Sequence, residues 1–398
     1  MKKNKLYICL LIFILVNIVY QPVSFATNKI IESTTKNDIS STDILESQVD
    51  SLNISQFINE AKKYSSDVFD DINFSDLFNS ALSGNLDNKQ LGKSILNILG
   101  KETLTSIRVI ASIIVIIIIH SILKSIGEGL ENKGIAQITF YVQYILIVTL
   151  IMVNFTDVIN MVKDSVNNLI GFSNSLIPLL ITLILSTGSI ASANLLQPIL
   201  LFLITFIGNF VNSIIIPIVL VSTALSIVSK ISDKIQLDKL SKFFKSSVIW
   251  ILGVILTLFV GLVSLEGTLS SSVDGITAKT AKAAVSSFVP VVGKILGDAV
   301  DTVIGCTTIL KNAVGILGVV VIIGICILPI LKLLTLMTTY YIGSAICEPI
   351  ADKKIIELLS QVGDTFKILL GIICSISVML IIGVTLVVKI SNTGLMYR

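Results

Sequence analysis

Few side chains in this sequence have the types and spacing that catalysis or metal binding requires. His120 is the single histidine, and a lone imidazole can complete neither a zinc site nor an H-E-x-x-H pair. The five cysteines are scattered and include no C-x-x-C pair. Gly92-Lys93-Ser94 lacks the earlier glycine of a P-loop, because Asp87 stands in its place, and no G-x-S-x-G is present. We therefore expect no enzymatic activity, no cofactor and no metal.

Two carboxylates lie within or beside apolar runs and are candidates for work inside a membrane. Glu266 is near the end of the run 248–269, and Glu348 stands beside Pro349. An ionisable group in a membrane segment is a functional candidate by default, although both side chains could instead snorkel to the headgroups. Prolines interrupt apolar segments in both halves of the chain, which keeps a transporter with broken helices open as an alternative.

A lysine-rich segment, 230–245, is the most basic stretch of the chain. Cytoplasmic loops of membrane proteins carry the lysine excess, so this segment is predicted to be cytoplasmic. Ile231, Ile235, Leu240 and Phe244 recur in it at helical spacing. It could therefore lie on the anionic inner leaflet or dock a cytoplasmic partner. Its five lysines are Lys230, Lys234, Lys239, Lys242 and Lys245.

The segment 271–306 is too polar to span a membrane and too apolar for an ordinary loop. Gly293 and Gly297 are four residues apart, so a second helix could approach closely there. Pro290 precedes them as a break, and Asp298 and Asp301 lie off the apolar face. We expect an amphipathic or re-entrant segment near 276–312 that lines a pore or an oligomer interface. The alternative is a surface helix with no special task.

The composition places these groups in a membrane protein. Among 398 residues, 53% are hydrophobic and 14% are charged, and the mean hydropathy is +0.92. Soluble domains carry about 25% charged residues, and a soluble fold could not hide so much apolar surface. The predicted fold is all-α and polytopic. No basic stripe with interleaved aromatic residues suggests nucleic-acid binding.

The N-terminus is typical of an exported protein. Residues 1–26 combine a lysine-rich start, an apolar run and Ser24-Phe25-Ala26 before the expected cleavage site, and so predict a signal peptide; an uncleaved anchor helix is the alternative. Either way, 27–102 is expected outside the cytoplasm, as a flexible linker followed by three short amphipathic helices within 52–100. Phe57, Ala61 and Tyr64 mark the apolar face of the first of these helices.

Seven or eight membrane spans are expected from the apolar runs, because about 20 apolar residues cross a bilayer. The run 190–228 is too long for one crossing, and Gly208, Asn209 and Asn212 could form a tight turn within it. A hairpin there also keeps the lysine-rich segment cytoplasmic. The first bundle is then 103–269, followed by 270–312 and the C-terminal membrane helices 313–398; whether 336–350 crosses is open. The other runs are 106–123, 135–155, 169–186, 248–269, 313–334 and 366–388.

The block TAKAAVSSFVPVVGKILGDAVDTVIGC, within 278–306, and the order of signal peptide, short external helices and many spans resemble the stage III sporulation protein AE family of endospore-forming bacteria. The resemblance implies a multi-pass protein of the mother-cell membrane that surrounds the forespore. It also implies partners: an ATPase similar to those of type II and type IV secretion, ring-forming membrane-anchored proteins and a forespore-side protein. The family has no catalytic residues to carry over.

Three functions are therefore compared. The first is a non-enzymatic channel or export-platform subunit of that sporulation complex, which we expect to form homo-oligomers in the bilayer. The second is a secondary transporter of a small solute or ion. The third is a membrane scaffold that recruits partners without forming a conduit.

Overall fold

The computed structural model describes residues 54–69, 133–231, 237–288 and 292–396, together with single positions and short pieces between 78 and 122. Side chains of 266–301 and of 390–396 are outside this description, and so is the predicted signal peptide. All described elements are helical, and they belong to a compact unit formed by Ser41–Arg398. The elements are α3 (Ile54–Phe69), α6 (Lys133–Ser186), α7 (Ile190–Phe210), the π-helix η1 (Val211–Ile215), α8 (Ile216–Ile231), α9 (Asp238–Phe288), α10 (Val292–Cys347) and α11 (Lys353–Met396).

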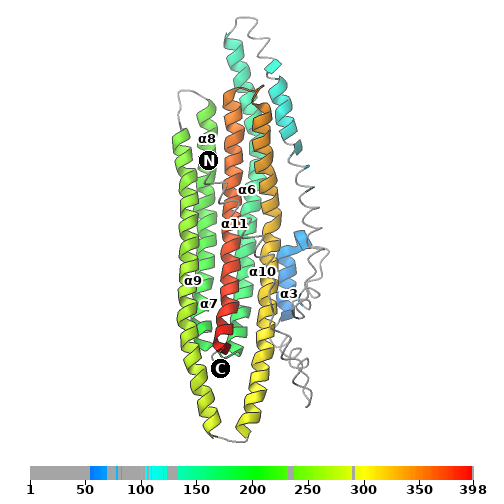
Figure 1. Ribbon diagram of the computed structural model, residues 1–398. Helices are drawn as coiled ribbons and strands as arrows, with labels where there is room; N and C mark the ends of the chain where they lie inside the picture. The colour runs from blue at the N-terminus through cyan, green and yellow to red at the C-terminus, as the bar shows by residue number, and fades with distance from the viewer. Residues whose placement is uncertain are drawn as a thin grey trace. The chain divides into compact units, whose positions relative to one another are not determined.

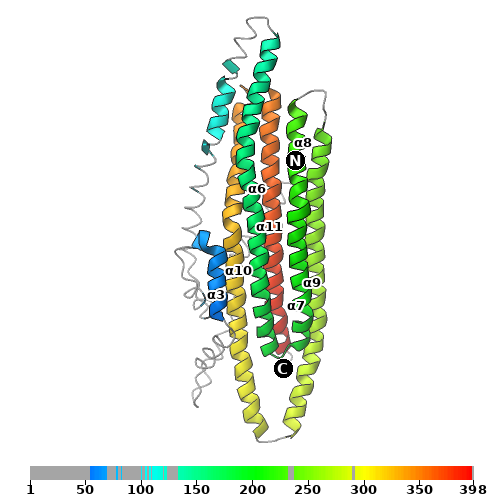
Figure 2. The ribbon, with the colours of Figure 1, turned by 180° about the vertical axis from the view of Figure 1, so that it is seen from behind.

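Five candidate membrane-spanning helices are found among the described residues, so the expectation of an all-α membrane protein is confirmed. Successive long helices run in opposite directions and lie side by side (Figures 1 and 2). They contain 42 to 56 residues, counting α7, η1 and α8 as one helix of 42. At 1.5 Å per residue these lengths are about 60–85 Å, well beyond the roughly 30 Å of a hydrocarbon layer.

The predicted turn within 190–228 is wrong. The chain passes from α7 through η1 into α8 without a break, and the amide of Val211 bonds to the carbonyl oxygens of Ile207 and Gly208. A π-helix absorbs an irregularity while the backbone groups stay hydrogen-bonded, which matters where water is scarce. Gly208 is a packing residue here: a Cβ at this position would collide with Ile170 of α6.

Other apolar runs that the sequence separates also lie on shared helices. The runs 135–155 and 169–186 are both part of α6, and 336–347 continues α10 and is not a separate crossing. The polar residues between such runs are compatible with a helix, so hydropathy alone marks gaps where the backbone does not turn. These merged runs account for part of the difference between the seven or eight predicted spans and the five candidate spans among the described residues. Of the predicted run 106–123, the described part contains Ile110–Ile119, an apolar helix shorter than a span.

Close helix contacts are made at glycines. Gly318 of α10 receives Leu176 of α6, and Gly383 of α11 receives Phe259 of α9, with no room for a Cβ without a shift of the neighbour. Small residues at such crossings are the usual way for membrane helices to approach one another, because lipid gives no hydrophobic drive for packing. α10 lies against α11, α6 and α3, and α11 also packs on α9, α8 and α7.

The helix α3 is the first of the short helices that the periodicity predicts. Phe57 and Ala61 are buried, and Phe57 and Tyr64 contact the ring of Phe172 on α6, with centroid distances of 5.8 and 6.1 Å. Gly171 leaves room for the Tyr64 hydroxyl. α3 therefore packs on α6 and α10 of its own chain.

Candidate functional site: a buried polar seam

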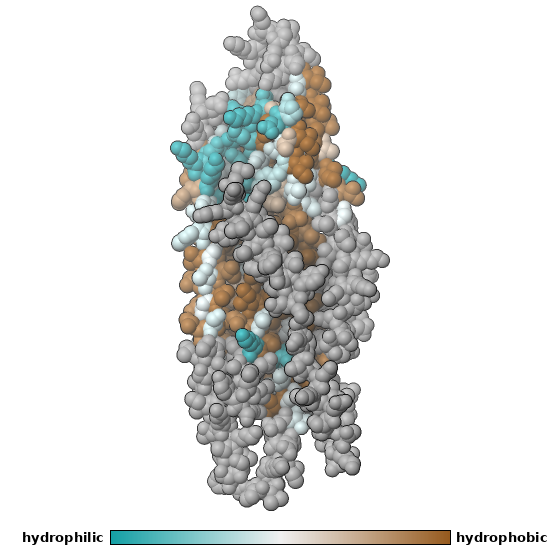
Figure 3. All heavy atoms as spheres, in the orientation of Figure 1, coloured by the Kyte–Doolittle hydropathy of each residue, from teal (hydrophilic) through white to brown (hydrophobic). Residues whose placement is uncertain are grey.

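Three helices present polar stripes to one another near the end of the bundle where α8 finishes. The positions recur every three or four residues, so each stripe lies on one face of its helix. We call this set the polar seam. In Figure 3 hydrophilic surface gathers at the upper left, while the surface at the upper right and below is largely hydrophobic. The seam consists of Ser222, Thr223, Ser226 and Lys230 of α8, Asp238, Ser241 and Lys245 of α9, and Glu357, Gln361, Asp364 and Thr365 of α11.

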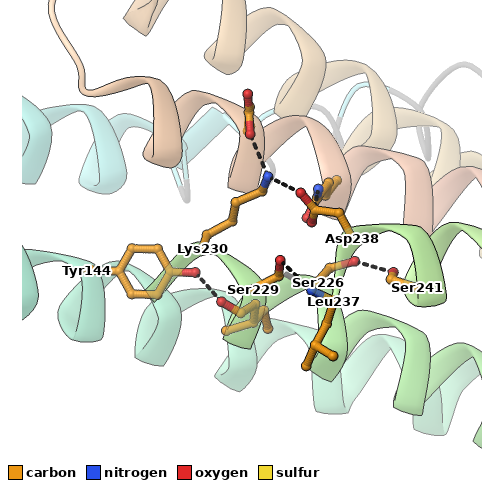
Figure 4. A network of polar contacts seen from close by, with 10 residues as sticks. Tyr144, Ser226, Ser229, Lys230, Leu237, Asp238 and Ser241 are labelled. Carbon is orange, nitrogen blue, oxygen red and sulfur yellow. Dashed lines mark hydrogen bonds and ion pairs between the residues drawn. The ribbon is translucent and has the colours of Figure 1, made fainter. Parts of the chain in front are cut away.

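Lys230 joins the three helices (Figure 4). Its Nζ lies 2.6 Å from Asp238 Oδ2 and 2.5 Å from Glu357 Oε2, and its side chain is 10% exposed. Asp238 also accepts a hydrogen bond from Gln361 Nε2 at 3.3 Å. Charge-assisted bonds of this kind are roughly twice as strong as neutral ones, and a buried ammonium requires them. Lys230 thus holds the end of α8 to the first turn of α9 and to α11.

A chain of serine hydroxyls continues inward from Lys230. Ser241 Oγ donates to the Ser222 carbonyl oxygen at 2.8 Å, so Ser226 is the donor in its 2.5 Å contact with Ser241. All three serines are 3% exposed or less. Ser229 also connects α8 with the start of α9, because its hydroxyl accepts from the amide of Leu237, the residue before α9, at 3.2 Å.

The inner part of the seam is tied to α11. Lys245, also buried, donates from Nζ to the Gln361 carbonyl oxygen at 3.0 Å. Thr223 and Thr365 are within 3.1 Å of each other through their hydroxyls. Tyr341 of α10 donates to Asp364 Oδ1 at 2.6 Å, which links a fourth helix.

A fifth helix joins through Tyr144 of α6, whose hydroxyl donates to the Ile227 carbonyl oxygen at 2.6 Å. That carbonyl is four residues before Ile231, the end of α8, so the tyrosine hydroxyl fastens α6 to the last part of α8. The seam therefore orders one end of the whole bundle and places charge and hydroxyl groups inside a candidate membrane segment. Such groups are costly there and usually mark a functional region.

The predicted cytoplasmic basic loop is mainly helix. α9 begins at Asp238, so Lys239, Lys242 and Lys245 lie in its first turns, and Lys234 is outside the described residues. Lys239 and Lys242 are exposed, whereas Lys230 and Lys245 are buried in the seam. Ile231 and Leu240 are exposed, as a lipid-facing side would be. On which side of the membrane this end lies stays a prediction.

The segment near 276–312 is not a separate element. It comprises the end of α9 and the start of α10, which carry on as helices past the end of α11 (Figures 1 and 2). Gly293, Gly297, Asp298 and Asp301 lie in the first turns of α10, and their side chains are outside the described residues. Pro290 itself is also outside them.

Two carboxylates were predicted to lie inside the membrane, and for Glu348 the structure gives a different location. It is exposed in the turn between α10 and α11, outside the candidate spans that end at Cys347 and resume at Lys353. α10 is long enough to extend as far as this turn, and the sequence did not indicate that length. Glu266 lies on α9, but its side chain is outside the described residues, as is His120. Within the described part of the chain, no three His, Cys, Asp or Glu side chains are grouped to hold a metal.

The seam partners of the lysines were missed by sequence reasoning. Ser222, Ser226 and Ser241 are small polar residues inside apolar runs, and a hydropathy window averages them away. The signal that could have found them is spacing: Ser222, Ser226 and Lys230 are four residues apart in succession. The partner Glu357 could not have been assigned, because no local pattern connects α8 with α11.

Comparison with known proteins shows to which family the chain belongs. The family model described as stage III sporulation protein AE matches residues 72–391. The stage III sporulation protein AE of Bacillus subtilis (strain 168) is 29% identical over 306 residues, which cover 77% of each chain. No solved structure matches. Since the family model covers most of the chain, including all five candidate spans, this chain belongs to the stage III sporulation protein AE family.

Proposed function

We propose that this chain is a non-enzymatic membrane subunit of a channel or export platform that endospore formation requires. Family membership carries the role in spore formation. In this proposal the protein resides in the mother-cell membrane around the forespore, and its partners are a secretion-type ATPase and ring-forming membrane proteins. The N-terminal region would then face the space between the two membranes, and the chain would form homo-oligomers.

The observation that supports this function best is the polar seam. A bundle that served only as an anchor would need apolar contacts alone, and buried ionic groups rarely raise the stability of a fold above that of apolar replacements. Here Lys230 and Lys245, with their acceptors from α9 and α11, are inside the part of the chain that the family shares. Hydrophilic groups inside a membrane bundle suit a protein that lets polar cargo or water pass or that changes packing during export.

Compartment-specific complementation tests the proposal. A spore-forming host that lacks its own copy would express this chain from a promoter active only in the mother cell or only in the forespore. We expect heat-resistant spores only with mother-cell expression. Affinity purification of the tagged chain should also recover the ATPase and the ring proteins. Rescue by expression in the forespore alone would contradict the proposal. So would rescued cells from which the tagged chain is purified without the ATPase and the ring proteins.

A seam variant connects the function with the geometry. Lys230→Met should lower spore yield while the protein still reaches the membrane, whereas Lys239→Met, an exposed lysine nine residues further along, should not. Membrane amounts are compared by immunoblot to separate loss of function from loss of protein. Equal spore yields from the two variants would show that the polar seam is not needed for this function.

A second candidate function, secondary transport of a small solute, is favoured by one observation. A cavity of about 350 Å³ lies between α3, α6 and α10, and Pro329, a proline inside the continuous helix α10, is on its wall. Prolines within apolar segments often accompany the substrate sites of transporters. Solute uptake by liposomes that contain the purified chain alone would support transport, and absence of flux would count against it.

A further inference from the structure

The cavity between α3, α6 and α10 is chemically one-sided. One wall is a polar stripe of α6 that includes Asp157, Asn160, Asp164 and Asn168. The opposite wall is formed by α10, including Ile325, Leu328 and Pro329, and Tyr64 of α3 contributes to the lining. No lysine, arginine or histidine is among the residues that line it. The cavity therefore offers oxygen acceptors on one side and an apolar surface on the other.

Its two carboxylates have no partner within the described part of the chain. Asp157 and Asp164 make no ion pair or side-chain hydrogen bond there, although both lie inside the candidate span Phe140–Ser186. By contrast, Asp238 and Glu357 of the polar seam pair with Lys230, and Asp364 accepts a hydrogen bond from Tyr341. A carboxylate in a membrane helix is costly unless a cationic group pairs with it, so a cationic ligand would suit these two.

The distance between the two carboxylates indicates which kind of cation could pair with both of them. Seven residues place Asp157 and Asp164 on the same face of α6, about 10 Å apart along the axis at 1.5 Å per residue. Oxygen ligands lie about 2.4 Å from a bound Ca²⁺, so two ligands of one ion are at most about 5 Å apart. One metal ion therefore cannot join both carboxylates, whereas an elongated molecule with a positive charge at each end can.

The opposite wall suits the middle of such a molecule. Ile325 and Leu328 offer apolar contact to a methylene chain. Pro329 has no amide hydrogen, so the Ile325 carbonyl oxygen four residues earlier lacks its helical donor. That carbonyl could accept from an inner ammonium group, as the amide oxygens of Asn160 and Asn168 could.

We infer that this cavity binds a linear polyamine, whose terminal ammonium groups pair with Asp157 and Asp164 and whose methylene chain lies on Ile325, Leu328 and Pro329. An extended chain advances about 1.2 Å per bond, so about nine bonds between the terminal nitrogens match the 10 Å spacing. Spermidine and 1,8-diaminooctane have this length. The inference concerns binding to this chain alone and does not depend on its role in export.

A length series tests the inference directly. Binding of 1,8-diaminooctane, spermidine and 1,3-diaminopropane to the purified full-length chain in lipid nanodiscs is measured by calorimetry at two salt concentrations. We expect the two long amines to bind at least about tenfold more tightly than 1,3-diaminopropane, which reaches one carboxylate only. The single-amine control 8-amino-1-octanol has the same length and should also bind about tenfold more weakly.

Isosteric variants assign the contacts. Asp157→Asn and Asp164→Asn should each weaken 1,8-diaminooctane by about tenfold and bring it close to 8-amino-1-octanol. Glu348→Gln removes an exposed carboxylate elsewhere and should leave binding unchanged. Both aspartates are at exposed positions, so unfolding temperatures should stay the same and loss of the fold can be excluded.

Three outcomes would overturn the inference. One is affinity that does not depend on chain length or on either aspartate. Another is that millimolar Mg²⁺ displaces the bound diamine as well as a competing diamine does, which would indicate a site for an inorganic cation. The third is binding of a lysine-containing peptide by the same aspartates without any diamine binding, which would make the cavity a protein-docking site.

Discussion

Lys230 of α8 and Glu357 of α11 are separated by 127 residues in the sequence, and their charged atoms are 2.5 Å apart. Asp238 of α9 completes the contact at 2.6 Å from the same ammonium. Three helices thus meet at one positive charge close to the end of the bundle. The contact joins the last turn of α8 to elements that follow it in the chain, and it makes Lys230 a structural centre of the polar seam.

Removing this charge should loosen the end of the bundle. Lys230→Met leaves Asp238 and Glu357 without a cation, and the two carboxylates then repel each other. Because their side chains are 35% and 40% exposed, we expect a loss of about 1–3 kcal/mol in unfolding free energy, below the range for fully buried pairs. Thermal and denaturant unfolding of the detergent-purified chain measures the loss.

A double-mutant cycle isolates the pair. Glu357→Gln in the Lys230→Met background should cost less than Glu357→Gln alone, because the pair is already broken. Lys239→Met, on the exposed side of α9, is the matched control and should change stability by less than about 0.5 kcal/mol. Additive effects of the two seam substitutions would show that Lys230 and Glu357 do not interact in the folded protein.

Lys230 also shows where sequence reasoning reaches its limit. Its charge and its place in a basic segment were evident, and helices, membrane insertion and the apolar face of α3 followed from composition and period. Its burial did not follow, because the compensating Glu357 comes from a distant helix. Likewise, Gly208 with Asn209 and Asn212 has the composition of a turn, but the contact between Gly208 and Ile170 favours a continuous helix.

The contact at Gly208 can be tested by a size exchange. Gly208→Leu should destabilise the α6–α7 packing by about 1–3 kcal/mol, since its Cβ would meet Ile170. Ile170→Ala should relieve part of that loss when the two substitutions are combined. Gly253→Leu is the control, because a Cβ at Gly253 meets nothing within 4 Å. Equal losses for positions 208 and 253 would argue against close packing at Gly208.

The glycines at the start of α10 bear on assembly. Gly293 and Gly297 lie on one face of a helix and leave a shallow surface that another helix could approach. Gly293→Leu and Gly297→Leu should reduce co-purification with the sporulation partners and lower spore yield. Gly261→Leu, at an exposed position with nothing within 4 Å, should do neither. Normal assembly and spore yield in both α10 variants would exclude a helix contact there.

The continuity of α7, η1 and α8 decides how the chain crosses the membrane. A single helix from Ile190 to Ile231 separates its ends by about 60 Å at 1.5 Å per residue. A hairpin turning at Gly208 would bring the same ends to within about 10–15 Å, the spacing of neighbouring helices plus side chains. Both end residues are exposed, so spin labels at positions 190 and 231 should be tolerated.

Pulsed electron spin resonance in nanodiscs then distinguishes the two arrangements. We expect a distance near 60 Å for the pair 190–231, and near 33 Å for a control pair at the exposed positions 240 and 262 of α9. The control calibrates the labels on one uninterrupted helix. A short 190–231 distance with a correct control distance would restore the hairpin, raise the number of crossings and invert the membrane side of every element after α7.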